Sequence, residues 1–403
     1  MASADLPIGR RVARLRVRRR MTQQMLADRL GKSKSWVDKV ERGVRALDRF
    51  TVIRDLAAAL RVDPVTLLGR DTRPPAAGTA VDGVGGVDGV RAALARYDTV
   101  LAGPGGRVAP PAGELGRQVG YAWLTYQHAD YPQLLRMLPD LLGDAQRVHA
   151  CGGGDDAAEL LVRAYGITSS VLVKLGEGDL GWLAADRAMS VATGDALLVA
   201  AATVPLGPAL RAVDRARLAM AATIAAARSI APSVPHDGPP EHLALCGTLL
   251  VQAALAAAAC GDAPGVRELV DQAAGIAERV GDDGPDLHWT GFGPTAVELA
   301  RVATAVDLGD GGEAVARHEK VVGSGDWRGL PAEHRAAYLL DAARAYLQVG
   351  DPLTAGRALV EADRTAPAEV RLRPVARTLI AALIRGGPVP ADVAHLATAV
   401  GVA

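Results

Sequence analysis

Apolar residues recur at helical spacing from residue 8 onward. Ile8, Val12 and Leu15 share one face of a first helix, which a basic run ends. A similar pattern predicts a fourth helix over 48–60, and the pair Asp63-Pro64 can open a fifth. The first seventy residues are therefore expected to form a small unit of short helices.

Two more helices are predicted between these, and their ends are marked by capping residues. Thr22 is a suitable N-cap for a second helix over 23–30, which Gly31 ends. Ser33 can cap a third helix over 34–41. The two short helices are thus expected to meet across a tight glycine turn.

Residues 71–89 are rich in Pro and Gly and show no helical period, so we expect a flexible linker there.

From residue 90 to residue 403, long Ala/Leu-rich helices alternate with turns and second amphipathic helices. An aspartate recurs at these turns, at intervals of 49, 35, 48, 48 and 41 residues: Asp130, Asp179, Asp214, Asp262, Asp310 and Asp351. This recurrence predicts stacked helix pairs.

Composition supports an all-α fold. Only 3% of the residues are aromatic, and Ala, Leu and Val supply most of the apolar surface, which favours closely packed helices over sheets. One stretch, 243–260, runs for 18 residues without a charge. Its high alanine content and its place among similar helices favour a buried helix over a membrane span.

The net charge of zero conceals an uneven distribution. Residues 1–73 hold 18 Lys and Arg against 8 Asp and Glu, a net charge of +10, so the remainder carries −10. Three of the five lysines lie between 32 and 39. A basic N-terminal unit joined to an acidic helical one suggests a polyanionic partner for the former.

Four segments in this unit follow a known order and spacing: 21–27 (MTQQMLA), 31–37 (GKSKSWV), 41–43 (ERG) and 56–60 (LAAAL). They resemble the XRE, or phage-repressor-type, helix-turn-helix family. The resemblance implies a five-helix domain over 1–70 that binds double-stranded DNA. The second helix of its central pair would enter the major groove.

The family pattern assigns DNA contacts to residues of this pair. Lys34, Ser35 and Lys39 would read base edges from the exposed face of the third helix. Gln23 and Ser33 match the family's phosphate contacts at helix N-termini. Arg42 and Arg45 follow the third helix, where the resemblance implies that the DNA backbone passes.

Three further residues have structural interpretations. Arg16 and Glu41 match an ion pair that in this family ties the first helix to the end of the third. Trp36 lies beside the base readers, where its indole either contacts DNA or packs against the second helix.

The C-terminal part resembles the tetratricopeptide-containing regulators of actinobacteria. Its best-formed unit has the tetratricopeptide order of apolar, small and aromatic positions: Leu339, Ala343, Tyr346, Ala355, Leu359, Ala362 and Pro367. We therefore expect a tetratricopeptide-like α-solenoid over 90–403 that forms a homodimer. Its concave face could hold a peptide, a small molecule or a protein.

Aromatic side chains are scarce in this chain, so two of them close together mark a candidate effector site. Trp289 and Phe292 form such a pair, with Thr295 following, although a helix start at Pro294 also explains this segment. We expect these residues to lie on or beside an effector pocket.

No catalytic residues, cofactor site or metal site can be assembled from the sequence, and we expect no enzyme. The three cysteines lack metal-ligand spacing, and no apolar signal segment precedes the first helix, which favours a cytoplasmic protein without a membrane partner. The sequence thus predicts a sequence-specific transcription regulator. The alternative is an interaction scaffold whose helix-turn-helix is a weak nucleic-acid tether.

Overall fold

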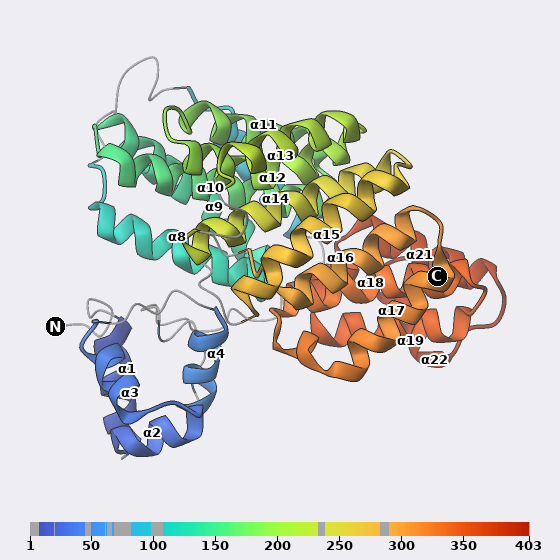
Figure 1. Ribbon diagram of the computed structural model, residues 1–403, viewed down its shortest axis with the longest axis horizontal. Helices are drawn as coiled ribbons and strands as arrows, with labels where there is room; N and C mark the ends of the chain where they lie inside the picture. Colours follow the sequence, from blue (N-terminus) through green and yellow to red (C-terminus); the bar gives the residue numbers. More distant parts are fainter. Residues whose placement is uncertain are drawn as a thin grey trace. The chain divides into compact units, whose positions relative to one another are not determined.

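The computed structural model describes residues 8–19, 21–44, 50–60, 62, 67, 82–97, 108–232, 238–282 and 290–402. Within these residues the secondary structure is helical and contains no strand, which confirms the all-α prediction. The chain divides into two compact units, with the boundary after residue 80 (Figure 1).

The N-terminal unit contains four described helices: α1 (Ile8–Arg18), α2 (Gln23–Leu30), α3 (Lys34–Glu41) and α4 (Phe50–Ala59). Their apolar faces meet in one core, whose fully buried members include Val12, Leu26, Val37 and Leu56. The expected fifth helix lies outside the described residues except for Leu67, which is buried in the same core. The carbonyl of Leu67 accepts a hydrogen bond from Arg11 Nε at 2.6 Å, so Leu67 is held against α1.

The second unit begins with α6 (Asp82–Leu94), and here the prediction for residues 71–89 is wrong in part. Residues 71–81 lie outside the described part of the chain, but 82–89 are helical rather than linker. The glycines that suggested a loop allow α6 to approach α9 (Tyr131–Ala150). A Cβ atom at Gly86 would lie 2.8 Å from Leu135 Cβ, and one at Gly89 would touch Pro139. Packing against α9 therefore outweighs the low helix propensity of glycine.

Six helix pairs follow α6 in this unit. They are α8 (Ala112–Gln127) with α9, α10 (Gly154–Lys174) with α11 (Gly178–Val191), α12 (Ala196–Ala212) with α13 (Ala216–Ser229), α14 (Pro240–Ala259) with α15 (Ala263–Val280), α16 (Pro294–Asp307) with α17 (Gly311–Ser324), and α18 (Ala332–Gln348) with α19 (Pro352–Thr365). A 3-10 turn, η2 (Asp326–Gly329), precedes α18, and α20 (Pro367–Arg371), α21 (Pro374–Arg385) and α22 (Ala391–Ala399) end the unit.

The same three-residue turn joins the two helices of every pair. Its middle residue has a positive φ, between 55° and 84°: Ala129, Gly176, Asp214, Gly261, Gly309 and Gly350. Four of the six are glycine because this left-handed conformation costs glycine least. The turn reverses the chain so that the second helix of each pair packs against the first.

Four of the six recurring aspartates cap the second helix of a pair. In these four the carboxylate accepts a hydrogen bond of 2.9–3.2 Å from the backbone amide three residues later: Asp130, Asp262, Asp310 and Asp351. Asp179 lies in the first turn of α11 instead, and Asp214 is itself a middle residue of a turn. The aspartate recurrence therefore marks helix N-termini, where a carboxylate satisfies a free amide.

Buried positions agree with the helical-repeat pattern expected from the sequence. In the unit predicted from residue 339, Leu339, Ala343, Leu359 and Ala362 are almost fully buried between α18, α19 and their neighbours.

Helix α14 is long and apolar enough to cross a membrane, the single such helix among the described residues. However, 72% of its most apolar window is buried inside the unit, as expected of a core helix.

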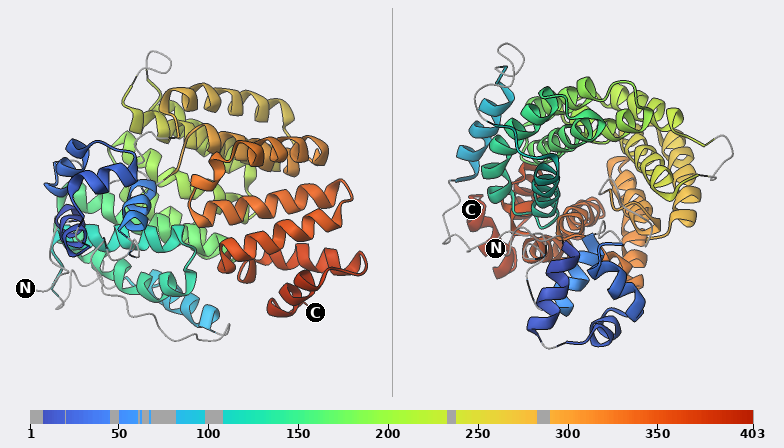
Figure 2. Two further views of the ribbon diagram at one scale, coloured as in Figure 1. Left: turned by 90° about the horizontal axis from the view of Figure 1, so that it is seen from below. Right: turned by 90° about the vertical axis from the view of Figure 1, so that its left-hand side faces the viewer.

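The helix pairs of this unit curve, as the right-hand view of Figure 2 shows, so that its C-terminal part returns to its N-terminal part and α18 packs against α8. Tyr126 on α8 and Glu333 on α18 are 207 residues apart in the sequence. The contact is polar at its centre. Lys174, at the end of α10, binds the carboxylates of Glu333 on α18 and Glu369 on α20, the latter at 2.6 Å.

Other buried groups complete this charged cluster. Tyr131 and Arg373 also bind the carboxylate of Glu369, which is fully buried. Burial alone raises the pKa of Glu369, but the charges of Lys174 and Arg373 and the hydrogen bonds from Lys174 and Tyr131 lower it to about 2. The carboxylate is therefore ionised at neutral pH and needs its cationic partners.

We expect Lys174→Met to destabilise this unit by about 3–5 kcal/mol, because two buried carboxylates would lose the ammonium that neutralises them. Urea unfolding followed by circular dichroism measures the change. The matched control is Lys320→Met, which removes an exposed lysine of α17 and should change the free energy of unfolding by less than about 0.5 kcal/mol. If the two variants unfolded alike, the cluster would not hold the ends of the unit together.

Candidate nucleic-acid interface

The central helix pair of the N-terminal unit has the caps that the sequence predicts. Thr22 Oγ1 accepts a hydrogen bond from the Met25 amide at 3.1 Å, and Ser33 Oγ accepts one from the Trp36 amide at 3.1 Å. Between them, Gly31 ends α2 in the left-handed conformation, with φ at 61°. The two helices begin and end at the predicted residues, so the register of α3 is fixed at its N-terminus.

One face of α3 is buried and the opposite face is exposed. Val37 and Val40 point into the core of the unit. Gly9 lets α1 approach this side of α3 closely, since a Cβ there would lie 2.1 Å from the Val40 carbonyl oxygen. A residue larger than glycine would push the two helices apart.

The exposed face carries the predicted base-reading residues. Lys34, Ser35 and Lys39 are all exposed, and Lys32 lies nearby in the preceding turn. Among the described residues, no carboxylate forms a salt bridge with Lys34 or Lys39. These two ammonium groups can therefore reach an external partner without breaking an internal ion pair.

The ion pair expected between α1 and the end of α3 is present. Arg16 Nε lies 2.6 Å from Glu41 Oε1, and Arg16 Nη2 lies 3.1 Å from the other carboxylate oxygen. Arg16 Nη1 also donates to the Met21 carbonyl at 2.7 Å. A two-point contact of this kind sets orientation as well as distance, so it holds α3 against α1 and the turn before α2.

Two further predicted DNA contacts, Gln23 and Arg42, have partners inside the unit. Gln23 Nε2 donates to Glu41 Oε2 at 2.8 Å, so part of its amide is used inside the unit. Arg42 pairs with Asp38 one turn earlier, and both are exposed. Arg42 would have to leave Asp38 to bind a phosphate, while Gln23 could add a contact through its remaining groups.

Trp36 lies between core and solvent. Its ring packs against the core of the unit while the side chain stays partly exposed. The indole therefore contributes to the core and keeps part of its surface exposed. Arg45, the last predicted DNA contact, lies outside the described residues.

The three residues predicted to bind an effector differ in their surroundings. Trp289 lies outside the described residues. Phe292 is buried against Gly247 on α14, where any Cβ would overlap its ring. Thr295, in the first turn of α16, donates to the Asp282 carboxylate from its amide, at 3.0 Å, and from its hydroxyl, at 2.7 Å, so Asp282 caps the start of this helix.

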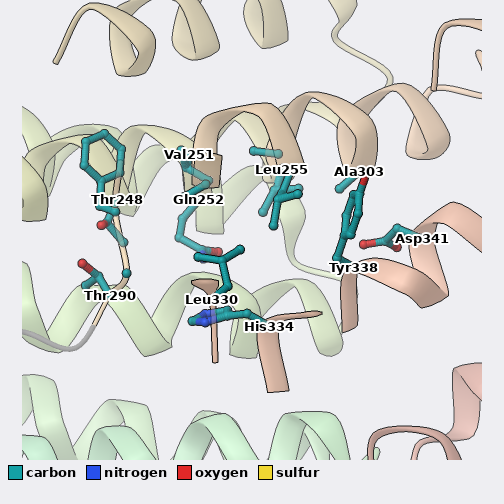
Figure 3. A pocket seen from close by; sticks show the side chains of 15 residues that line it. Thr248, Val251, Gln252, Leu255, Thr290, Ala303, Leu330, His334, Tyr338 and Asp341 are labelled. Atoms are coloured by element: carbon teal, nitrogen blue, oxygen red, sulfur yellow. The ribbon is translucent and has the colours of Figure 1, made fainter. Parts of the chain in front are cut away.

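A pocket of about 240 Å³ lies beside Phe292, between α14, α16 and α18. Figure 3 shows its labelled side chains. Phe292 lines it, and Thr295 does not. Its polar lining also includes residues that were not predicted: Thr248, Gln252, Thr290, His334, Tyr338 and Asp341. These residues are up to 93 positions apart in the sequence. The helical repeat places the first helices of successive pairs side by side, and this is the one sequence signal that could have predicted that they lie together.

Other site chemistry is sparse in the part of the chain that the structure describes. There, no group of three or more His, Cys, Asp or Glu side chains could hold a metal ion. Of the three free cysteines, Cys246 is buried, and burial raises the pKa of its thiol.

Comparisons with known proteins support the N-terminal assignment. Residues 7–68 match the model of a helix-turn-helix domain family, so this unit is a helix-turn-helix domain. No curated protein matches the chain. Among solved structures, Bacillus thuringiensis PlcR in complex with the peptide PapR7 and DNA is similar at 11% identity, covering 68% of this chain and 94% of that one. The TM-score of 0.29 is too low for a conclusion about this chain.

We expect Glu41→Ala to loosen the docking of α3 by about 3 kcal/mol, because it leaves the mostly buried Arg16 without its partner. Amide hydrogen exchange over α3 in the full chain measures this opening free energy. Asp38→Ala is the matched control, because it removes an exposed carboxylate from the same helix and should cost less than about 1 kcal/mol. Equal exchange in the two variants would contradict the orienting role of the ion pair.

Proposed function

We propose that this protein is a sequence-specific DNA-binding transcription regulator of the XRE type. The observation that carries the proposal is the exposed face of α3. There Lys34, Ser35 and Lys39 form no salt bridge with any described residue, on a helix fixed by its cap and by the Arg16–Glu41 pair. A rigid helix with cationic and hydroxyl groups along its exposed face suits the edges of bases in the major groove.

Different residues would supply affinity and specificity. Lys34 and Lys39 would donate to guanine O6 and N7, while Arg42 would bind phosphate. The residues up to 73 carry a net charge of +10 and would attract the duplex at long range. The acidic remainder of the chain would not add to this attraction, so binding would be confined to the helix-turn-helix domain.

The proposed regulation works through the second unit, which would bind an effector and dimerise. An effector changes DNA affinity only if it binds the DNA-competent and incompetent arrangements unequally, typically by about 1–3 kcal/mol. The pocket beside Phe292 supports such a role, because it combines an apolar wall with several polar side chains. Thr295 would then act indirectly, through the start of α16.

An interaction scaffold with a weak nucleic-acid tether would have the same charge distribution but not the same selectivity. A regulator needs a specificity ratio of roughly 10³ or more over random DNA. This ratio, measured on a selected site and on random duplex, tells the two functions apart.

We expect Lys34→Ala to weaken binding to the selected site by about 1–3 kcal/mol and to relax the preference at one base position. Arg42→Ala should instead weaken all sequences alike and lower the slope of log K against log salt by about 1. Fluorescence anisotropy on selected and random duplexes at several salt concentrations measures both effects. If both variants lost specific and random binding equally, α3 would not be the recognition helix.

We also expect two copies of the chain to bind one site. A single helix-turn-helix reads few base pairs, and two copies on a two-fold site would contact half-sites about 34–36 Å apart. Light scattering and footprinting on the selected duplex test this expectation. A monomer at micromolar concentration that protects one half-site would exclude it.

A further inference from the structure

We propose that the second unit forms a two-fold dimer in which α11 of each protomer packs against α13 of its partner. The inference rests on the dimerisation proposed above and deepens it by naming the surface. Its test uses the full chain without DNA and compares variants, so the interface can fail while the proposed function stands.

Helices α11 and α13 lie in the same layer of the helical repeat. The first helices α10, α12 and α14 pack against one another, and α11 and α13 both pack against α12. The same turn precedes α11 and α13, with Gly176 and Asp214 at its centre, so the two helices run in one direction. Each keeps one face exposed. The layer therefore presents two parallel stripes of side chains.

The exposed stripe of α11 is acidic and carries a tryptophan. Asp179, Trp182 and Asp186 are exposed and lie three and four residues apart, so they share one face. Neither aspartate forms a salt bridge with a described residue. The arginine of this helix, Arg187, lies over the Tyr97 ring instead, 5.1 Å from its centre. Trp182 is 45% exposed, more than any other described tryptophan, and exposed tryptophans are frequent anchors of protein interfaces.

The exposed stripe of α13 is basic and apolar. Leu218 is 58% exposed, and the exposed small side chains of Ala221 and Ala225 follow it on the same face. Arg215 and Arg217 precede it, exposed and without a salt bridge to a described residue. The helix and its preceding turn hold three arginines and one aspartate, a net charge of +2. This stripe has space for a large ring beside its cations.

A second copy of the chain complements both stripes at once. A two-fold axis along the helices brings α11 of one protomer onto α13 of its partner, with both helices pointing the same way. Asp179 and Arg217 are each the second residue of their helix, so they face each other. Trp182, the fifth residue of α11, then falls between Leu218 and Ala221, the third and sixth residues of α13.

The charges distinguish this arrangement from the other two-fold one. An axis across the helices would pair α11 with α11 and α13 with α13. Aspartates would then face aspartates and arginines would face arginines, and like charges in an interface oppose association. The arrangement along the helices pairs opposite charges twice, once on each side of the axis. It also uses the same patch on both protomers, so the assembly closes as a dimer.

Charge reversal in the full chain tests the contact between α11 and α13. Asp179→Arg and Arg217→Glu should each raise the dissociation constant of the dimer at least about tenfold, because each creates two like-charged pairs across the axis. Sedimentation equilibrium measures this constant. An equimolar mixture of the two variants should dimerise again. In the mixed dimer the introduced arginine faces the introduced glutamate, and the native Arg217 faces the native Asp179.

A third variant tests the apolar anchor. Trp182→Ala removes the indole from both contacts and should also weaken the dimer at least about tenfold. Its matched control is Leu353→Ala, which shortens a side chain of α19 that is 49% exposed. Glu114→Arg, in the first turn of α8, and Arg385→Glu, in the last turn of α21, are the controls for the reversals. All three controls should leave the dissociation constant within about twofold of the parent value.

Thermal unfolding followed by circular dichroism establishes that each variant is folded. A parent chain that is monomeric at micromolar concentration would overturn the interface. A dimer that all three variants leave intact would also overturn it. That result would leave the dimeric regulator standing, with another surface between its protomers and this face available to a different protein. A mixture of the two reversed variants that stayed monomeric would contradict the pairing of α11 with α13.

Discussion

The ammonium group of Lys174 holds together the two ends of the helical-repeat unit. It lies between carboxylates on α18 and α20. An ordinary helical repeat contacts only its neighbours and can stretch or bend. Here a buried charge adds a contact across about 160–200 residues of chain, so the first helices of successive pairs keep a fixed arrangement. The pocket between α14, α16 and α18 depends on that arrangement.

Local signals in the sequence predicted the elements well. Thr22, Ser33 and Gly31 determine the ends of α2 and α3 through hydrogen bonds and a backbone conformation that involve only nearby residues. The recurring aspartates predicted the second helices of the pairs for the same reason. The helix-turn-helix assignment also depends on local spacing. The resemblance based on that spacing predicted the Arg16–Glu41 ion pair, which the structure contains.

Features that depend on distant residues were not predicted. The first residues of helix α6 were predicted as linker because glycine has a low helix propensity. In the structure its glycines allow close packing against α9, and propensity takes no account of such a contact. The Lys174 cluster joins residues from four helices and Arg373, which precedes α21, and each is an ordinary charged or aromatic residue in its own segment. In the pocket, Phe292 was found as a rare aromatic, but His334 and Asp341 carry no local signal that separates them from a solvent-facing polar stripe.

Selection from a pool of random duplexes with the full chain, followed by sequencing, tests whether α3 recognises DNA sequence. If it does, the selection will enrich a two-fold symmetric motif with half-sites about 10 base pairs apart, bound roughly 10³ times more tightly than random duplex. Binding that rises at low salt but enriches no motif would contradict base recognition by α3 and leave only a non-specific electrostatic attraction.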